Sequence, residues 1–148
     1  MLPNLQSFES GSSEGDKPAM PEVGDSLGAN LYKEFVSQID GGKDMSSAIE
    51  AISDESISGY NCMSMDVEEG LLNGFDAEIK GFTNGKMFGP VIGSIPFVCY
   101  GFETDDTEAL KSTLLSHADP RWNICTEADE TFCEAYGNYV FFVMLPNE

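Results

Sequence analysis

Residues 138–145 read Asn-Tyr-Val-Phe-Phe-Val-Met-Leu, an almost unbroken run of apolar and aromatic side chains. A strand with one face in water alternates apolar and polar residues, whereas a strand covered on both faces is apolar throughout. This stretch therefore predicts an interior strand of a sheet. Residues 91–102 predict a second buried strand after an irregular start. Because proline cannot donate to a ladder, Pro96 is expected at an edge, a bulge or the beginning of that strand.

Shorter patterns indicate the rest of the sheet. Residues 60–67 have the texture of a strand, and in residues 75–80 apolar side chains alternate with charged ones, as in a strand with one wet face. Gly70 and Asn73–Gly74 supply turns, and Asn84–Gly85 suits a tight type I′ hairpin turn. Together these patterns predict a mainly antiparallel sheet of about five strands.

Two helices are expected before the sheet. Asn30 is the predicted N-cap of the first helix, which Gly41–Gly42 terminate. Asp44 is the predicted N-cap of a second helix, which begins at about Met45 and has an apolar face that extends to Ile52. The short connection between them predicts a helical hairpin.

Two further helices are expected within the second half of the chain. Asp105 and Glu108 have the spacing of a capping box for a helix that runs to about His117. Thr126 is the predicted N-cap of another helix, which Gly137 closes. The apolar face of this last helix would consist of Ala128, Phe132, Ala135 and Tyr136. The predicted fold class is therefore α+β, with an N-terminal helical hairpin and two further helices packed on the sheet.

Composition sets the domain organisation and excludes some classes of partner. Residues 1–29 are rich in Ser, Gly, Pro and Glu and predict a flexible tether, which leaves residues 30–148 as a single domain. The formal net charge of the 148-residue chain is −19, and residues 30–148 alone hold 21 acidic against 6 basic side chains, a balance of −15. Such a field repels phosphate backbones and anionic lipid surfaces, so nucleic-acid and membrane binding are not expected.

The reactive side chains gather in one short stretch, residues 117–125, which contains the single His, the single Arg and the single Trp of the chain. An Arg beside a Trp can bind a carboxylate while the indole packs against the rest of a ligand. Arg121 and Trp122, with His117 and Asp119 beside them, are therefore the candidate ligand-binding residues. The structural alternative is that Arg121 pairs with Asp119, or with an acid of the following helix, and simply holds the junction together.

The four cysteines, Cys62, Cys99, Cys125 and Cys133, lack the close paired spacing of a zinc site. No acidic group has calcium-loop spacing either, so neither a metal nor a cofactor is expected. A disulfide between Cys62 and Cys99 across neighbouring strands is one reading, and four reduced thiols are the other. At the N-terminus of the helix predicted from residue 126, Cys125 would have a lowered thiol pKa and could act as a nucleophile with His117 as base.

Four phrases carry a resemblance to known proteins: residues 69–75, 92–97, 119–125 and 137–144. Together they resemble a group of small uncharacterised proteins of anaerobic Gram-positive bacteria, which are secreted or anchored as lipoproteins. The resemblance covers about residues 66–146. It implies a location in the cell envelope and no assigned activity, and therefore no functional residues. The chain as given shows no signal peptide and no lipid-attachment cysteine near Met1, so a cytoplasmic location is the alternative.

The leading functional hypothesis is a non-enzymatic extracytoplasmic binding or accessory domain. Its ligand would be a small molecule, a peptide or a protein. One alternative is a small thiol-dependent enzyme that uses Cys125 and His117. The other is a structural or subunit-interaction domain, which an exposed aromatic patch around Trp122 would favour. The sequence leaves the oligomeric state open.

Overall fold

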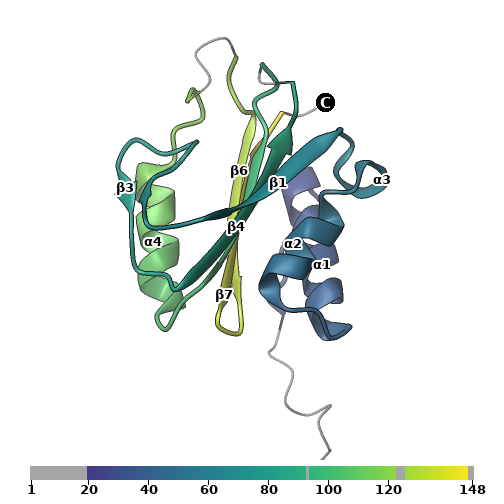
Figure 1. Ribbon diagram of the computed structural model, residues 1–148, viewed down its shortest axis with the longest axis vertical. Helices are drawn as coiled ribbons and strands as arrows, with labels where there is room; N and C mark the ends of the chain where they lie inside the picture. The colour runs from purple at the N-terminus through teal and green to yellow at the C-terminus, as the bar shows by residue number, and fades with distance from the viewer. Residues whose placement is uncertain (1–19, 93, 123–125, 147–148) are drawn as a thin grey trace, which may run out of the picture.

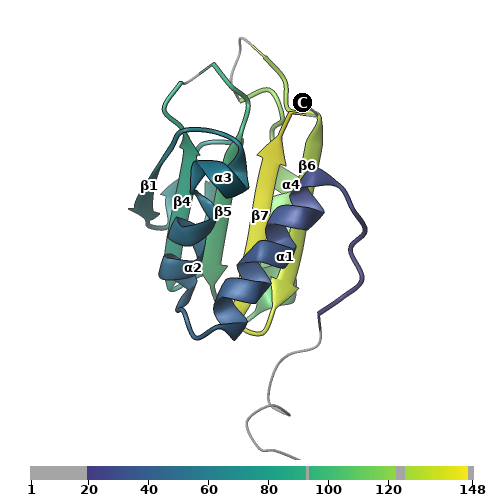
Figure 2. The ribbon, with the colours of Figure 1, turned by 90° about the vertical axis from the view of Figure 1, so that its right-hand side faces the viewer.

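The computed structural model describes residues 20–92, 94–122 and 126–146. A five-stranded antiparallel sheet lies between two helical layers (Figure 1). The strand order is β1-β4-β5-β7-β6, which Figure 2 shows from the side of α1 and α2. A separate two-stranded ladder pairs β2 with β3. The helices are α1 (Leu27–Asp40), α2 (Met45–Ile52), α3 (Glu55–Ser58) and α4 (Thr107–His117), and the strands are β1 (Cys62–Val67), β2 (Gly70–Leu71), β3 (Glu78–Ile79), β4 (Asn84–Pro90), β5 (Val98–Glu103), β6 (Glu130–Tyr136) and β7 (Tyr139–Leu145).

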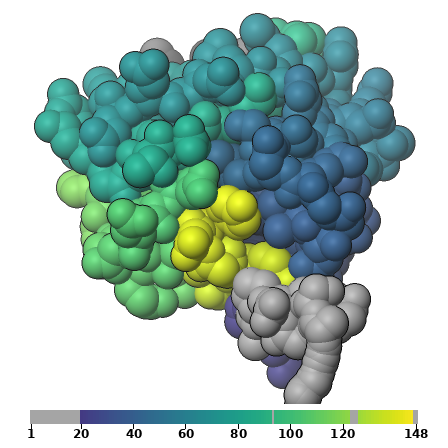
Figure 3. All heavy atoms as spheres, turned by 60° about the horizontal axis from the view of Figure 1, so that its bottom comes forward, coloured from purple at the N-terminus to yellow at the C-terminus, as the bar shows by residue number. Residues whose placement is uncertain are grey.

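The predicted interior strand is confirmed. β7 lies between β5 and β6 and is covered on both faces. Phe141 and Val143 belong to the core beneath α1 and α2, whereas Phe142 and Met144 belong to the core beneath α4. In the view of Figure 3, the turn between β6 and β7 emerges between the two helical layers. The continuous apolar run thus reflects a strand with helices on both sides, and the α+β class is confirmed.

The helical hairpin is also present, but it begins earlier than the sequence indicated. Ser26, not Asn30, is the N-cap of α1, because its side chain accepts a hydrogen bond from the backbone N–H of Ala29. Residues 27–29, assigned to the tether, therefore form the first turn of α1, while residues 1–19 lie outside the described residues. Asp44 is the N-cap of α2 as predicted. Helix α1 covers β6 and β7, and α2 covers β4 and β5.

The helix predicted from Thr126 is wrong, because residues 130–136 form strand β6 at the edge of the sheet. Tyr136 pairs with Tyr139, so Gly137 and Asn138 form the two-residue turn of a hairpin. Gly137 has φ 62°, a left-handed conformation that glycine adopts without strain. A glycine in this conformation ends a helix or turns a hairpin equally well, and the ladder with β7 selects the hairpin.

The hairpin turn predicted at Asn84–Gly85 is wrong as well. Both residues are the first of β4 and pair with Glu103 and Phe102 of β5. Glycine is needed at 85 for space, because a Cβ there would lie 2.6 Å from Cγ2 of Val67 on the neighbouring strand. The Asn-Gly signal therefore marks a close approach of two strands and not a turn.

Helix α4 forms as expected, with its N-cap shifted by one residue. Asp106, not Asp105, accepts a hydrogen bond from the backbone N–H of Ala109. The helix covers β6 and β7 on the face opposite α1. An ion pair of 3.0 Å between Lys111 Nζ and Glu134 Oε2 links it to β6. Since the chain passes from β5 through α4 to β6, the crossover leaves a gap in the sheet that β7 fills.

Candidate functional site

The predicted site at residues 117–122 is a connection that fixes the end of α4. The His117 Nδ1 and Asp76 Oδ1 atoms lie 2.9 Å apart, and the Asp76 backbone N–H donates to the His117 carbonyl at 3.0 Å. The Asp119 N–H donates to the Gly74 carbonyl, and the Asp119 carboxylate accepts from the N–H of Arg121. His117 and Asp119 are therefore occupied in joining α4 to the segment around residue 75.

The guanidinium and the indole of the junction point to different surroundings. Arg121 is exposed, and its Nη1 atom lies 3.4 Å from Glu127 Oε1. This contact matches the structural alternative, in which Arg121 pairs with an acid of the following segment. Trp122 instead packs against the core beneath α4 and lines a surface depression to which Arg121 does not contribute. Arg121 and Trp122 are therefore neighbours in sequence, but their side chains do not line the same depression.

The depression at Trp122 lies on the same face of the sheet as α4, at the β1 side. Its volume is about 200 Å³. Methionines from β1 and β4 form much of its lining, and Met63 and Met65 are 55% and 48% exposed. We call Met63, Met65, Met87 and Trp122 the Met–Trp surface. Asn73, Gly89, Pro90, Ile95, Phe97 and Val98 complete the lining.

Of the two readings of Cys62 and Cys99, the structure shows reduced thiols and not a disulfide. Cys62 lies in β1 and Cys99 in β5, with β4 between them, and both are free thiols. Two strand spacings amount to roughly 9–10 Å, beyond the roughly 7 Å that a disulfide spans between Cα atoms. Cys125 lies outside the described residues, and the helix expected to lower the pKa of its thiol is absent because β6 takes its place.

Burial raises the pKa of each cysteine thiol that the structure describes. The pKa of Cys99 lies well above its ordinary value, and burial raises the pKa of Cys133 to about 12 although Lys111 acts in the opposite direction. For Cys62, burial outweighs the hydrogen bond with Ser58, so its pKa is raised too. A thiol with a raised pKa is a poor nucleophile near neutral pH.

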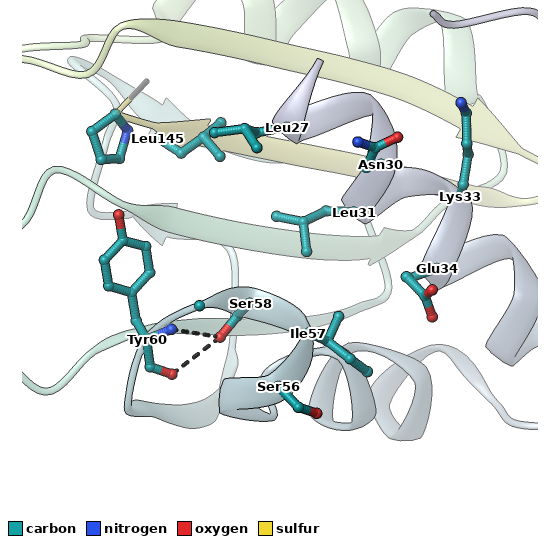
Figure 4. Close-up of a pocket in the computed structure, with 12 residues that line it drawn as sticks. Leu27, Asn30, Leu31, Lys33, Glu34, Ser56, Ile57, Ser58, Tyr60 and Leu145 are labelled. Atoms are coloured by element: carbon teal, nitrogen blue, oxygen red, sulfur yellow. Dashed lines mark hydrogen bonds between the residues drawn. The ribbon is translucent and has the colours of Figure 1, made fainter. Parts of the chain in front are cut away.

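A larger hollow, which we call the α1–α3 cleft, has a volume of about 640 Å³ (Figure 4). Helix α1 supplies residues at positions 27, 30, 31 and 34, which share one helical face, together with Lys33. The short helix α3 and the turn after it form the opposite wall, and the end of β7 closes one side. The lining residues are Leu27, Asn30, Leu31, Lys33, Glu34, Ser56, Ile57, Ser58, Gly59, Tyr60, Leu145 and Pro146.

The floor of the α1–α3 cleft is apolar and its rim is polar. Leu31 and Leu145 are buried at the base, and the half-exposed Leu27 stands above them. The Tyr60 ring projects toward the Leu145 side of the cleft (Figure 4), and no described residue offers its hydroxyl a hydrogen-bond partner. Glu34 places an exposed carboxylate at the rim.

Part of the polar rim is already committed to internal bonds. Lys33 Nζ lies 3.5 Å from Asp25 Oδ1, and the Asn30 side-chain amide donates to the Asp25 carbonyl. Ser58 Oγ accepts a hydrogen bond from the Tyr60 N–H, and its one proton lies within reach of the Ser53 and Tyr60 carbonyls. Ser58 therefore holds the wall of the cleft in place and is not available to a ligand. The Tyr60 hydroxyl and the Glu34 carboxylate remain as polar groups able to meet a ligand.

The sequence does not indicate this cleft, because one of its walls is the short helix α3. A helix of four residues shows no apolar period, so only its caps could reveal it. Asp54 accepts a hydrogen bond from the Ser56 N–H, and Gly59 ends the helix with φ 89°. The spacing of an Asp and a Gly around residues 55–58 is the one local signal of this turn.

The fold and the cleft define a small three-layer α+β domain with a ligand-sized hollow that has an apolar floor. Within residues 20–92, 94–122 and 126–146, no group of three or more His, Cys, Asp or Glu side chains is arranged to hold a metal ion. None of the helices in these ranges has the length and apolar character needed to cross a membrane. Comparison with known protein families, with curated proteins and with solved structures finds no match. The resemblance to small envelope proteins of anaerobic Gram-positive bacteria therefore stays a prediction.

Proposed function

We propose that this protein is a non-enzymatic binding domain that takes a small amphipathic ligand into the α1–α3 cleft. The observation that carries the proposal is the cleft itself, whose volume of about 640 Å³ falls within the range of small-molecule sites. Its apolar floor and few polar rim groups are the usual composition of such sites. The location that fits the tether and the resemblance is the cell envelope.

The charge of the chain favours a ligand with a cationic or hydrogen-bonding end. A net charge of −19 raises the local concentration of cations and repels anions. The Glu34 carboxylate at the rim can pair with an ammonium group, and the Tyr60 hydroxyl can donate or accept one hydrogen bond. An alkyl or branched side chain would meanwhile cover Leu27 and Leu31.

A thermal-shift titration with octylamine tests the proposal, with octanoate as the charge-reversed probe. A ligand that binds only the native state raises the melting temperature. With free octylamine about 100-fold above its Kd, the expected gain is about 2.7 kcal/mol, or about 5–10 °C for a domain of this size. Octanoate should give a much smaller shift because its carboxylate meets the acidic rim.

Two matched variants locate the effect. Leu27→Lys places an ammonium group in the wall of the cleft and should abolish the octylamine shift. Leu115→Lys changes a residue of nearly equal exposure, 47% against 45%, on α4 across the sheet, and should leave the shift intact. An octylamine shift that survives Leu27→Lys, or no shift at all, would contradict the proposal.

The thiol-dependent enzyme is disfavoured because strand β6 replaces the helix that was expected to lower the pKa of Cys125, its predicted nucleophile. The raised pKa of the three described thiols makes them poor substitutes for that nucleophile. A thiol-reactivity titration of the native protein separates the two proposals. If no cysteine reacts as a thiolate below about pH 8, the enzyme has no nucleophile. Reaction of Cys125 near neutral pH would instead restore it.

A further inference from the structure

We propose that the open edge of β1 accepts an extended peptide segment as a sixth strand, and that this segment carries apolar residues at alternate positions with lysine or arginine between them. The surface lies apart from the α1–α3 cleft, so the inference does not depend on the function proposed for the cleft. It develops the third reading of the sequence, an interaction domain, from a different set of residues.

The two edges of the sheet are not equivalent. At the β6 edge, Glu130 accepts hydrogen bonds from Ser26 and from the Gly28 N–H, so the start of α1 lies against that strand. At the other edge β1 faces the viewer in Figure 1, with no helix in front of it. A long uncovered edge strand with apolar side chains promotes pairing with another chain unless it is blocked.

The hydrogen-bonding direction along β1 follows from its neighbour. The Val91 N–H donates to the Asn61 carbonyl at 2.9 Å, which places the residue pairs bonded to β4 at odd-numbered positions. By the alternation of an antiparallel ladder, the N–H and C=O groups of Cys62, Ser64 and Asp66 point away from β4. These groups form a backbone template for an incoming strand.

On the α4 side of the sheet, the side chains of β1 favour an added strand with apolar residues. Met63 and Met65 lie on the α4 side of the sheet, where they line the depression together with Met87 and Trp122. Methionine side chains adapt to differently shaped partners, and an aromatic ring adds a large contact area. Alternate side chains of an added strand would therefore enter the Met–Trp surface.

Charge determines which extended segment fits. Asp66, Glu68 and Glu69 lie at one end of the edge. Among the residues that the structure describes, only Lys86 forms an ion pair with one of them, at 3.3 Å from Asp66 Oδ1. At the other end of the edge, Glu55 lies close enough to Cys62 to add to the rise that burial causes in the pKa of its thiol. A strand that brings ammonium or guanidinium groups gains from these carboxylates, whereas a second copy of this chain would add another charge of −19.

The test uses the full chain and an eight-residue peptide that alternates valine with lysine. Trp122 is the only tryptophan, so its fluorescence reports directly on occupation of the Met–Trp surface. We expect saturable binding that weakens as salt is added, because exposed charges are screened. A peptide of the same residues in non-alternating order, and one that alternates valine with glutamate, should bind at least about tenfold more weakly.

Two variants separate backbone pairing from simple contact. Ser64→Pro removes an outward N–H at a position where an edge strand tolerates proline, and should weaken the lysine peptide about tenfold or more. Met65→Lys introduces a cation into the Met–Trp surface without changing the backbone, and it should weaken binding by a similar factor. This variant provides the test if Ser64→Pro does not fold. Leu115→Lys, on α4, should leave the affinity unchanged.

Several results would overturn the inference. Equal affinity for the lysine and glutamate peptides would show that charge does not select the peptide. Unchanged binding by folded Ser64→Pro would show that the peptide does not pair with the backbone of β1. A concentration-dependent dimer in sedimentation velocity that Ser64→Pro abolishes would show that a second copy of the chain occupies the edge. Retention of the lysine-peptide signal with Leu115→Lys and its loss with Met65→Lys would support the proposal.

Discussion

Single residues fix how closely the layers approach one another, and Gly101 in β5 is the tightest such point on the α2 side. A Cβ at this position would lie 2.6 Å from Ile49 Cγ1 and 3.0 Å from Met45 Sδ. Helix α2 can therefore lie directly on β5 only because residue 101 has no side chain. The same kind of close approach explains Gly85, which lies in β4 directly beside Val67 of β1, at a position where the sequence suggested a turn.

The Gly101→Ala variant should lower the free energy of unfolding by about 1–3 kcal/mol, because the added methyl overpacks a filled interface. Urea denaturation measures the loss as a lower midpoint with an unchanged slope. Gly41→Ala is the matched control, since a Cβ there would make an ordinary contact of 3.4 Å and the residue has φ −79°. Equal stability of Gly101→Ala and the wild type would show that α2 can move away from β5 without cost.

At the scale of elements, the N-terminus of α4 allows a direct comparison of two adjacent carboxylates. Asp106 accepts a hydrogen bond from the Ala109 N–H, whereas the exposed Asp105 precedes the cap. Asp106→Ala should lower the free energy of unfolding by about 0.5–2 kcal/mol, as for other helix N-caps, and Asp105→Ala by much less. Chemical denaturation of both variants checks the assignment. A larger loss from Asp105→Ala would place the cap where the sequence pattern first put it.

The elements also show how far the sequence could predict the fold. The apolar run of β7 and the polar caps of α2 and α4 are local signals, and they predicted the right elements within one or two residues. Residues 126–136 carry helix signals of the same kind, a Thr N-cap and acids in the first turn, yet residues 130–136 form β6. The ladder with β7 overrides the local preference, because pairing gives hydrogen-bond partners to the backbone N–H and C=O groups that β6 directs toward β7.

The candidate site was less predictable than the fold, for a physical reason. The stretch from His117 to Trp122 attracted attention because its residue types are rare in this chain, but rarity does not place a side chain in a hollow. His117 and Asp119 form internal contacts, whereas Trp122 lines a depression. The α1–α3 cleft brings together residues far apart in sequence, Leu27, Tyr60 and Leu145 among them, and no local pattern indicates such a meeting.

For the whole molecule, buried phenols and thiols set an alkaline limit to stability. Burial raises the pKa of Tyr32 and Tyr100 above the ordinary value of 10.0. Burial and a hydrogen bond with Asp40 raise the pKa of Tyr136 to about 12. In the unfolded chain these groups lose their protons at lower pH than in the folded chain. The unfolded state therefore binds fewer protons at high pH, and stability falls as the pH rises.

The free energy of unfolding should be insensitive to these groups below about pH 8 and should decline progressively between about pH 8 and pH 12. The lower end of this window comes from thiols such as Cys133, whose pKa rises from 9.0 to about 12 on burial. Urea midpoints measured across this range, followed by Trp122 fluorescence, check the trend. Tyrosinate absorbance of the folded protein gives the complementary reading. Full ionisation of all tyrosines near pH 10 in a protein that is still folded would contradict it.

The position of β7 has a consequence for biosynthesis. Among the described elements it is the last to leave the ribosome, yet it lies between β5 and β6, which are made earlier. While residues 139–145 are still in the exit tunnel, β6 has no neighbouring strand, β5 is paired with β4 alone, and α4 lacks one of the two strands that it covers. Until β7 emerges, the apolar segments of the nascent chain are therefore accessible to chaperones, and the sheet is completed in one late step.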